Sequence, residues 1–317
     1  MTGTPAPTSS PAPLIIGVTS HRNLMPGEIE GLRARVRALF AQLKKQFPEL
    51  PLVLMSALAE GGDRLVAEEA LACGARLTAV LPLPVELYRE DFSDAESRRR
   101  FHELCSASSV LQMPLLHRST TQGIAVHGEQ RDAQYAEAGV FIASHCHILL
   151  AIWDGRDSDL TGGTAQIVRY HLDGILPGTV ERRRASRPLF DRGDESLLCH
   201  LVCSRRDGEG AALPPVARLE PLQMRWISQQ DDQPFEEGIP AEFAEMFQRM
   251  VEFNQDQTRY RTPIAEHCPL DCGTQGEAQN SPSTAFSCAC DWLAIHLPNP
   301  LLPPIPRLHL LQPPTAN

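Results

Sequence analysis

The chain has 317 residues, of which 42% are hydrophobic and 21% are charged, as is typical of a globular protein with a sizeable core. Its formal net charge of −10 argues against affinity that rests on neutralising nucleic-acid phosphates, because such proteins usually carry a basic excess. We therefore do not expect a nucleic-acid partner, although a local basic patch is compatible with this balance.

The chain begins with a stretch, residues 1–13, that is rich in Thr, Pro and Ala. It lacks the basic start and the apolar segment of a signal peptide, so we expect a flexible tail and no secretion. No apolar run approaches the roughly 18 residues that a membrane span needs. The nine cysteines are scattered through predicted core segments, as at Cys73, Cys105 and Cys146, which indicates reduced thiols in a cytoplasmic protein.

The first part of the chain alternates short apolar runs with amphipathic stretches. Gly74 suits the end of a helix because glycine adopts positive φ without strain, and Pro82 and Pro84 stop the strand before them. In chain order, the predicted elements are strand 14–19, helix 26–47, strand 52–55, helix 63–73 and strand 76–81.

The same alternation continues to about residue 172. The predicted elements are helix 94–107, strand 110–113, helix 129–144, strand 147–152 and helix 164–172. Alternating strands and helices with continuously apolar strands predict a Rossmann-like α/β fold, in which helices cover both faces of a parallel sheet. We expect Ile16, Val53, Val80 and Leu149 to lie in buried central strands. Such sheets bind ligands at the carboxyl ends of their strands, where the strand order reverses.

The pattern weakens after residue 178. A strand is predicted at 197–202, and a helix at 241–254 carries Phe243, Met246, Phe247 and Met250 on one side. From about Thr262, Pro, Cys, Ser and Gln dominate. The expected organisation is a tail at 1–13, a nucleotide-binding domain at 14–178, an extension at 179–260 that packs on it, and a poorly ordered tail at 261–317.

The sharpest local feature follows the strand at 147–152. Glycines permit close approach of a ligand to the backbone, and the amides of a helix N-terminus bind anions, so this loop suits phosphate. The same spacing also fits a plain loop in which Thr161 or Thr164 caps the helix. The candidate ligand-binding residues here are Trp153, Asp154, Gly155, Thr161, Gly162, Gly163, Thr164 and Gln166.

Two other strand ends carry polar and small residues. Arg22 would suit a bidentate phosphate contact, whereas Asp63 would also serve as a helix cap, and a loop histidine or arginine is often merely solvated. Three such loops at one edge of a parallel sheet are harder to explain by chance than one. The candidates are Gly17, Thr19, Ser20, His21 and Arg22 after the first strand, and Ser56, Glu60, Gly61, Asp63 and Arg64 after the second.

Together these loops resemble the SLOG superfamily, which unites the DNA-processing protein DprA/Smf with the LOG cytokinin-activating phosphoribohydrolases. The resemblance covers roughly the N-terminal half and implies a Rossmann-like fold with the ligand over the glycine loops. The loops are most similar to those of nucleotide-sensing members from bacterial conflict systems. That similarity implies recognition of a nucleotide-derived signal and its transmission to an effector.

The sequence departs from the LOG enzymes at their catalytic motif. Those enzymes carry a glutamate shortly after a fuller glycine motif, whereas here Gln166 can bind a ligand but cannot act as a general acid or base. Binding or sensing of a nucleotide is therefore our first interpretation. A phosphoribohydrolase is the alternative, with Glu60, Asp63 and Arg131 as its candidate catalytic residues, and single-stranded DNA binding comes third. No cofactor is implied.

Several features are not interpreted as sites. The spacing of His267, Cys268, Cys272, Cys288 and Cys290 fits no standard zinc motif, so we predict no metal. Cys199 and Cys203 lie in an apolar run and are interpreted as core thiols. The segment 291–297 resembles a juncture at which related proteins continue into a membrane-spanning effector, and whether the C-terminus is truncated or frame-altered is left open. A homo-oligomer and a separate effector partner are both left open.

Overall fold

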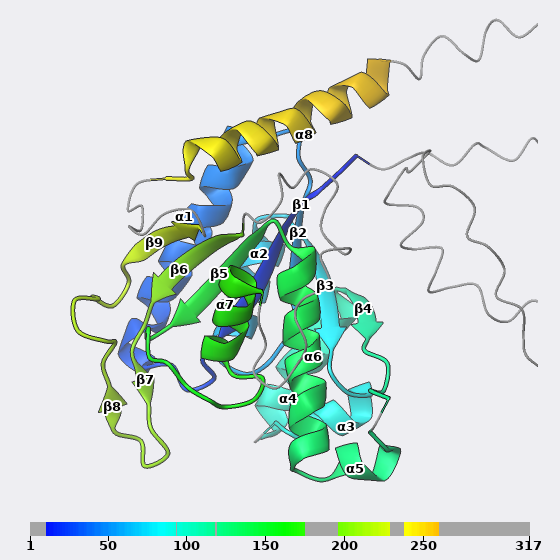
Figure 1. The fold of residues 1–317 in the computed structure, drawn as a ribbon, viewed down its shortest axis with the longest axis vertical. Helices are drawn as coiled ribbons and strands as arrows, with labels where there is room; N and C mark the ends of the chain where they lie inside the picture. The colour runs from blue at the N-terminus through cyan, green and yellow to red at the C-terminus, as the bar shows by residue number, and fades with distance from the viewer. Residues whose placement is uncertain (1–10, 93, 118, 175–195, 229–237, 260–317) are drawn as a thin grey trace, which may run out of the picture. The chain divides into compact units, whose positions relative to one another are not determined.

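One sheet organises the fold. The computed structural model describes residues 11–92, 94–117, 119–174, 196–228 and 238–259. The strands are β1 Leu14–Ser20, β2 Leu52–Ser56, β3 Arg76–Leu81, β4 Ser109–Gln112, β5 Ile148–Trp153, β6 Leu197–Val202 and β9 Met224–Ser228. They form a seven-stranded sheet in the order β4-β3-β2-β1-β5-β6-β9 (Figure 1). Every neighbouring pair is parallel except β6 and β9, which confirms the predicted parallel sheet.

The central strands are buried on both faces. Ile16, Val80 and Leu149 are 0% exposed and Val53 is 9% exposed, which confirms the four predicted core positions. A strand covered on both faces needs apolar side chains at successive positions, and this explains why these strands read as continuous apolar runs.

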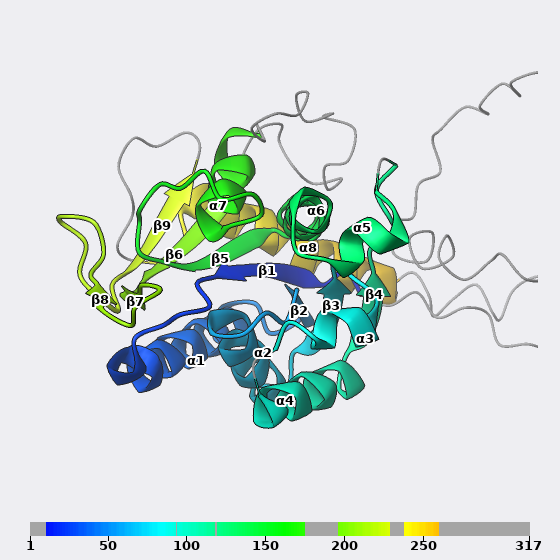
Figure 2. The ribbon, with the colours of Figure 1, turned by 90° about the horizontal axis from the view of Figure 1, so that it is seen from below.

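Helices cover both faces of the sheet, as Figure 2 shows. One face carries α1 Ile29–Gln46, α2 Gly62–Ala72 and α4 Ala95–Ser106, and the other carries α6 Glu129–His145 and α7 Thr164–Asp173. The sequence did not predict the short helices α3 Val85–Arg89 and α5 Thr121–Ala125, and the first three residues of the predicted helix 26–47 form a 3₁₀ turn, Pro26–Glu28. The Rossmann-like α/β class is confirmed.

Local signals in the sequence set several helix ends. The carboxylate of Asp94 accepts a hydrogen bond from the amide of Ser97 at 2.7 Å and caps α4. Helix α2 ends at Ala72, and Gly74 has a φ of +82° just beyond its C-cap residue. Both ends lie within one or two residues of the predicted boundaries.

The segment after residue 195 completes the sheet and covers one of its edges. Strand β6 lies beside β5, the small hairpin of β7 Arg205–Arg206 and β8 Ala212–Leu213 follows, and β9 was not predicted. Helix α8, Ala241–Arg259, runs across the edge where the strands begin (Figure 1). Phe247 is fully buried there, with its ring centroid 5.4 Å from that of Phe47 and 6.4 Å from that of His147. Helix α8 therefore leaves the carboxyl edge of the sheet to the loops.

Some expectations fall outside the described residues. These are the poor packing of residues 1–10 and of the tail at 261–317, and the joint between the two predicted domains at 178–179. The division into four parts stays a prediction. Among the helices that the structure describes, none has the length and apolar character needed to cross a membrane.

Candidate functional site

The strand order reverses between β1 and β5. From β1 the chain moves outward through β2, β3 and β4, and it then returns to β5 on the other side of β1. Loops that leave such a pair of strands at their carboxyl ends diverge, and the crevice between them is where sheets of this kind bind ligands. The amide of His21 donates to the carbonyl of Ile152 at 3.1 Å, and the amide of Gly62 donates to the carbonyl of His21 at 3.2 Å. The loops after β1, β2 and β5 therefore meet at this point.

Two glycines allow the loops after β1 and β2 to touch. Gly61 has a φ of +86°, and a Cβ atom there would lie 2.4 Å from the carbonyl oxygen of Arg22. A Cβ atom on Gly62 would lie 2.6 Å from the Cβ atom of Ser20. Only glycine fits such an approach without displacing the neighbouring chain. The predicted glycine loop thus exists, and it accommodates backbone from the adjacent loop.

A buried carboxylate lies where these two loops meet. Oδ1 of Asp63 accepts a hydrogen bond from Oγ of Ser20 at 2.6 Å, and the residue is 4% exposed. Burial raises the pKa of Asp63 to about 6, although the bond from Ser20 and the charge of Arg22 act in the opposite direction. The N-cap residue of α2 is Gly61. Asp63 is therefore a buried, titratable group bonded to the loop after β1, and it does not occupy the N-cap position.

We expect Asp63→Asn to stabilise the protein at neutral pH. An acid whose folded pKa is raised favours its neutral form, so its contribution is complete below about pH 4 and is lost as the pH rises through about 6. Asparagine keeps an acceptor for Ser20 without the charge, and we expect a gain of about 2 kcal/mol at pH 8. Urea denaturation at pH 5 and pH 8 measures it, with the exposed Asp159→Asn as control. An equal effect at both pH values would contradict the prediction.

Asp154 connects three loops below the surface. It is 0% exposed, its Oδ1 lies 3.0 Å from Nε2 of His21, and its Oδ2 accepts from Nε of Arg205 at 2.7 Å. The amide of Arg156 donates to Oδ1 at 3.0 Å. Burial opposes ionisation, but these donors outweigh it and hold the pKa of Asp154 below its usual range. Asp154 therefore joins the loops after β1, β5 and β6 from inside.

Two amides of the glycine turn before α7 form hydrogen bonds with groups close by in the chain. Gly162 has a φ of +74°, and a Cβ atom there would lie 2.9 Å from the amide nitrogen of Ala136 in α6. Its amide donates to Oε1 of Gln166 at 2.6 Å, and the amide of Gly163 donates to the carbonyl of Leu160 at 2.9 Å. Gln166 is 4% exposed, so its side chain serves this turn. The first intrahelical bond comes from the amide of residue 167, which leaves those of 164–166 at the helix N-terminus.

Other predicted residues lie around this centre. Gly17 lies within β1, where a Cβ atom would come within 3 Å of side chains on α6. Oγ of Ser56 accepts from the amide of Leu58 at 3.0 Å. Of the three threonines, Thr19 is half-buried near the end of β1, Thr161 is exposed and Thr164 is buried. Nε1 of Trp153 donates to the carbonyl of Arg156 at 3.0 Å. The Cβ position of Gly155 faces Val216 and Leu219.

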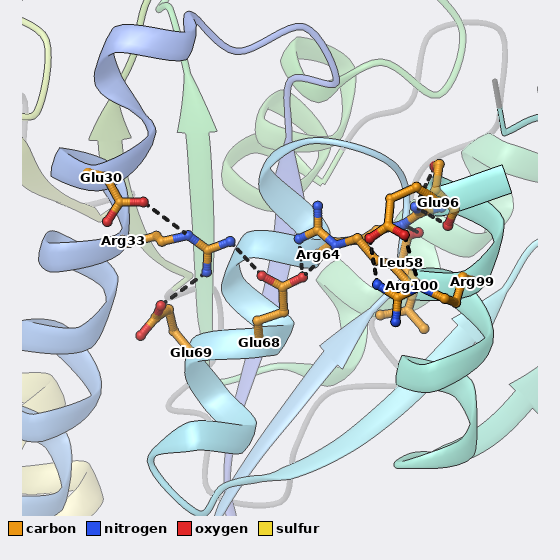
Figure 3. Close-up of polar contacts among 10 residues, drawn as sticks. Glu30, Arg33, Leu58, Arg64, Glu68, Glu69, Glu96, Arg99 and Arg100 are labelled. Atoms are coloured by element: carbon orange, nitrogen blue, oxygen red, sulfur yellow. Dashed lines mark hydrogen bonds and ion pairs between the residues drawn. The ribbon is translucent and has the colours of Figure 1, made fainter. Parts of the chain in front are cut away.

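Arg64, labelled in Figure 3, and Glu60 connect the loop after β2 to α4. Nε of Arg64 donates to the carbonyl of Leu58 at 3.0 Å, and Nη1 donates to Oγ of Ser97 at 2.7 Å. The same hydroxyl donates to the carboxylate of Glu60. Ion pairs of the arginines on α1 and α4 with the carboxylates of α2 continue this network across the helical layer (Figure 3). These contacts therefore hold the loop after β2 against α4.

Arg22 is the exposed cation of the site. It forms no hydrogen bond or ion pair with any residue that the structure describes, and its Cζ atom lies 5.7 Å from the ring centroid of Tyr135. Desolvation by itself would lower the pKa of Arg22. The nearby acidic groups of Tyr88, Tyr135, Asp91 and Asp63 outweigh that effect, and the pKa of Arg22 is raised above its usual value. Arg22 therefore presents a positive charge at the switch point between β1 and β5.

Sequence reasoning missed the residues that surround Arg22 on α3 and α6. Tyr88 is on α3, Asp91 follows it, and Tyr135 is on α6; the phenol of Tyr135 donates to the carboxylate of Asp91. The structure places Arg131, a candidate for catalysis, 3% exposed with Nη2 2.5 Å from Oδ1 of Asp91. Tyr88, Asp91 and Tyr135 lie outside the strand ends, so no local signal pointed to them.

Metal ligation finds no support in the part of the chain that the structure describes, where no group of three or more His, Cys, Asp or Glu residues could hold an ion. The cysteines and the histidine between residues 267 and 290 lie outside that part. Cys199 and Cys203 are both fully buried, as predicted for core thiols.

Comparisons with known proteins found limited similarity to two solved structures. No protein-family model and no curated protein matches the sequence. Among solved structures, DNA processing protein A (DprA) from Streptococcus pneumoniae is similar, with 15% identity and a TM-score of 0.32 over 49% of this chain and 45% of that one. DprA from Helicobacter pylori, described by its single-stranded DNA binding mode, is similar with 15% identity and a TM-score of 0.32, over 50% of this chain and 62% of that one.

These matches correct one expectation and limit another. Both proteins are DprA, a member of the superfamily that the loops resemble, and the nucleotide-sensing branch is not among these matches. Because one of them binds single-stranded DNA, our expectation against a nucleic-acid partner is contradicted. Net charge averages over the whole surface, whereas nucleic acid contacts only one local part of it, so an acidic balance does not exclude such a partner. At this identity and TM-score, the likeness identifies no ligand for this chain.

Proposed function

We propose that the carboxyl edge of the sheet binds the phosphate of a nucleotide or nucleotide-derived signal. The observation that carries this proposal is the position of Arg22, a cation with no hydrogen-bond or ion-pair partner among the described residues, at the point where the strand order reverses. A guanidinium is well suited to phosphate oxygens. The amides of residues 164–166 at the start of α7 would supply further donors.

Hydrolysis of a nucleotide is the alternative to regulatory binding. A glycosidase needs a carboxylic group beside the scissile bond. Glu60 accepts a hydrogen bond from Ser97, and Arg131 is buried against Asp91, which leaves Asp63 as the predicted catalytic residue with a pKa near neutrality. A hydrolytic function would therefore depend on Asp63, and release of free base from a nucleotide by the purified chain would establish it.

Arg22→Ala should weaken nucleotide binding without unfolding the protein. Loss of a charge-assisted hydrogen bond corresponds to about 1.5–3 kcal/mol, or roughly a 10- to 150-fold higher Kd. The experiment is a thermal-shift screen with nucleoside mono- and diphosphates, cyclic nucleotides and a single-stranded oligonucleotide, followed by titration calorimetry with whichever binds. A ligand at a hundred times its Kd adds about 2.7 kcal/mol of stability.

The matched control is Arg35→Ala, which removes an exposed arginine from α1, away from the carboxyl edge. Its Kd should equal that of the unmodified protein. If both variants lose affinity equally, the binding depends on general charge and our site is misplaced. If no probe in the panel binds the unmodified chain, the proposed function is wrong.

A further inference from the structure

Two buried polar atoms near Arg22 have no hydrogen-bond partner among the described residues. They are Oη of Tyr88, on a residue that is 0% exposed, and Nη2 of Arg64, on a residue that is 3% exposed. The other nitrogens of Arg64 are bonded to Leu58 and Ser97. Buried polar groups are nearly always paired in proteins, so two orphaned atoms together indicate that a further group belongs beside them.

The two atoms belong to one cluster. The ring centroid of Tyr88 lies 5.0 Å from that of Phe92, and Cζ of Arg64 lies 4.1 Å from the same centroid. The charges of Arg22, Asp63 and Arg64 all act on the pKa of the Tyr88 phenol, and those of Arg22 and Arg64 act on that of Asp63. We call Asp63, Arg64 and Tyr88 the Tyr88 cluster. The ring centroid of Tyr88 lies 6.0 Å from that of Tyr135, and Cζ of Arg22 lies 5.7 Å from the Tyr135 centroid, so Tyr135 connects the cluster to Arg22.

The donors and acceptors of the cluster select one kind of group. Nη2 of Arg64 can only donate, the Tyr88 phenol can donate or accept, and the carboxylate of Asp63 accepts. A hydroxyl can accept from Arg64 and donate to Tyr88 or Asp63. An aromatic amine is a poor acceptor for Arg64, and the negative charge of Asp63 opposes a phosphate here.

We propose that the Tyr88 cluster binds a hydroxyl of the same ligand whose phosphate Arg22 holds. The ligand is then a phosphorylated sugar or a nucleotide that contains one, with Tyr88 as a specificity-determining residue. This inference rests on the proposed function, because it takes Arg22 as the phosphate anchor. It adds the sugar as a recognised part of the ligand.

The test compares ribose 5-phosphate with ethyl phosphate, which has the same charged group and no hydroxyl. Titration calorimetry on the full chain should show at least a tenfold lower Kd for ribose 5-phosphate. In Tyr88→Phe that preference should fall to less than about twofold, while the Kd for ethyl phosphate stays unchanged. A preference that persists in Tyr88→Phe, or no preference in the unmodified chain, overturns the inference. If Arg22→Ala does not weaken binding of either probe, or neither probe binds, the proposed function fails instead.

A second measurement needs no ligand. Removing an unpaired buried hydroxyl relieves its desolvation, so Tyr88→Phe should raise the Tm of the ligand-free chain by about 2–4 °C. The control is Tyr170→Phe, because the phenol of Tyr170 lies 3.0 Å from Oγ of Ser144 and its loss should lower the Tm. A lowered Tm in Tyr88→Phe would mean that the phenol is satisfied within the protein, which would also overturn the inference.

Discussion

Gly61→Ala is expected to lower the free energy of unfolding by about 3 kcal/mol and to abolish nucleotide binding. Gly61 has a φ of +86° and a ψ of −126°, which lies outside the left-handed helical region and costs an alanine of the order of 1–3 kcal/mol. In addition, its Cβ atom would lie 2.4 Å from the carbonyl oxygen of Arg22, so the backbone of the neighbouring loop must move. That further strain is of the order of 1–3 kcal/mol. Because Arg22 itself is displaced, the proposed phosphate anchor moves with it.

The chain offers a matched control in Gly210. This glycine also has a φ of +86°, but its Cβ position has no neighbour within 4 Å. Gly210→Ala should therefore show the cost of a positive φ without a close contact, about 1–2 kcal/mol. Urea denaturation of both variants measures how much more the backbone conformation of Gly61 and its close approach to Arg22 cost together. Equal destabilisation would show that the contact between the two loops is unimportant.

The main elements of the sheet were predictable because local sequence determines them. Strands such as β3 and β6 are continuous apolar runs that end at Pro or at small polar residues, and their predicted and observed bounds coincide. The short helix α3 and the edge strand β9 were missed. Helix α3 has five residues, which is too short for a helical period of apolar positions to be recognised. Strand β9 pairs with one neighbour and is only partly buried, so its sequence is not a continuous apolar run.

The candidate site was predictable only in part. The topology of a parallel sheet brings strand ends together, so Ser20 and Asp63, 43 positions apart, were correctly expected at one edge. Spacing does not reveal the partner that a polar residue acquires. Gln166, which was predicted to bind a ligand, instead accepts a hydrogen bond from the amide of Gly162 in the turn before α7. Tyr88 and Tyr135 come together, at 6.0 Å between ring centroids, only because α3 and α6 pack against each other in the folded chain.

Asp154→Ala should destabilise the protein strongly above pH 5 and somewhat less at pH 3. Removing one member of a buried, hydrogen-bonded charge network typically costs about 3–5 kcal/mol, because the remaining charges lose their partner. Here Arg205 and His21 would lose the carboxylate that joins the loops after β1, β5 and β6.

The pH dependence follows from the depressed pKa of Asp154. The stability that its ionised form contributes is present above the pKa of an unfolded aspartate, about 4, and is lost as the pH falls through the lower folded value. Urea denaturation of the unmodified chain and Asp154→Ala at pH 7, 5 and 3 should therefore show a gap that narrows toward pH 3. The control is Asp157→Ala, whose carboxylate is 73% exposed and pairs with Arg169 at the surface, and it should change stability by less than about 1 kcal/mol. A gap that stays constant with pH would mean that Asp154 acts by packing and not by its charge.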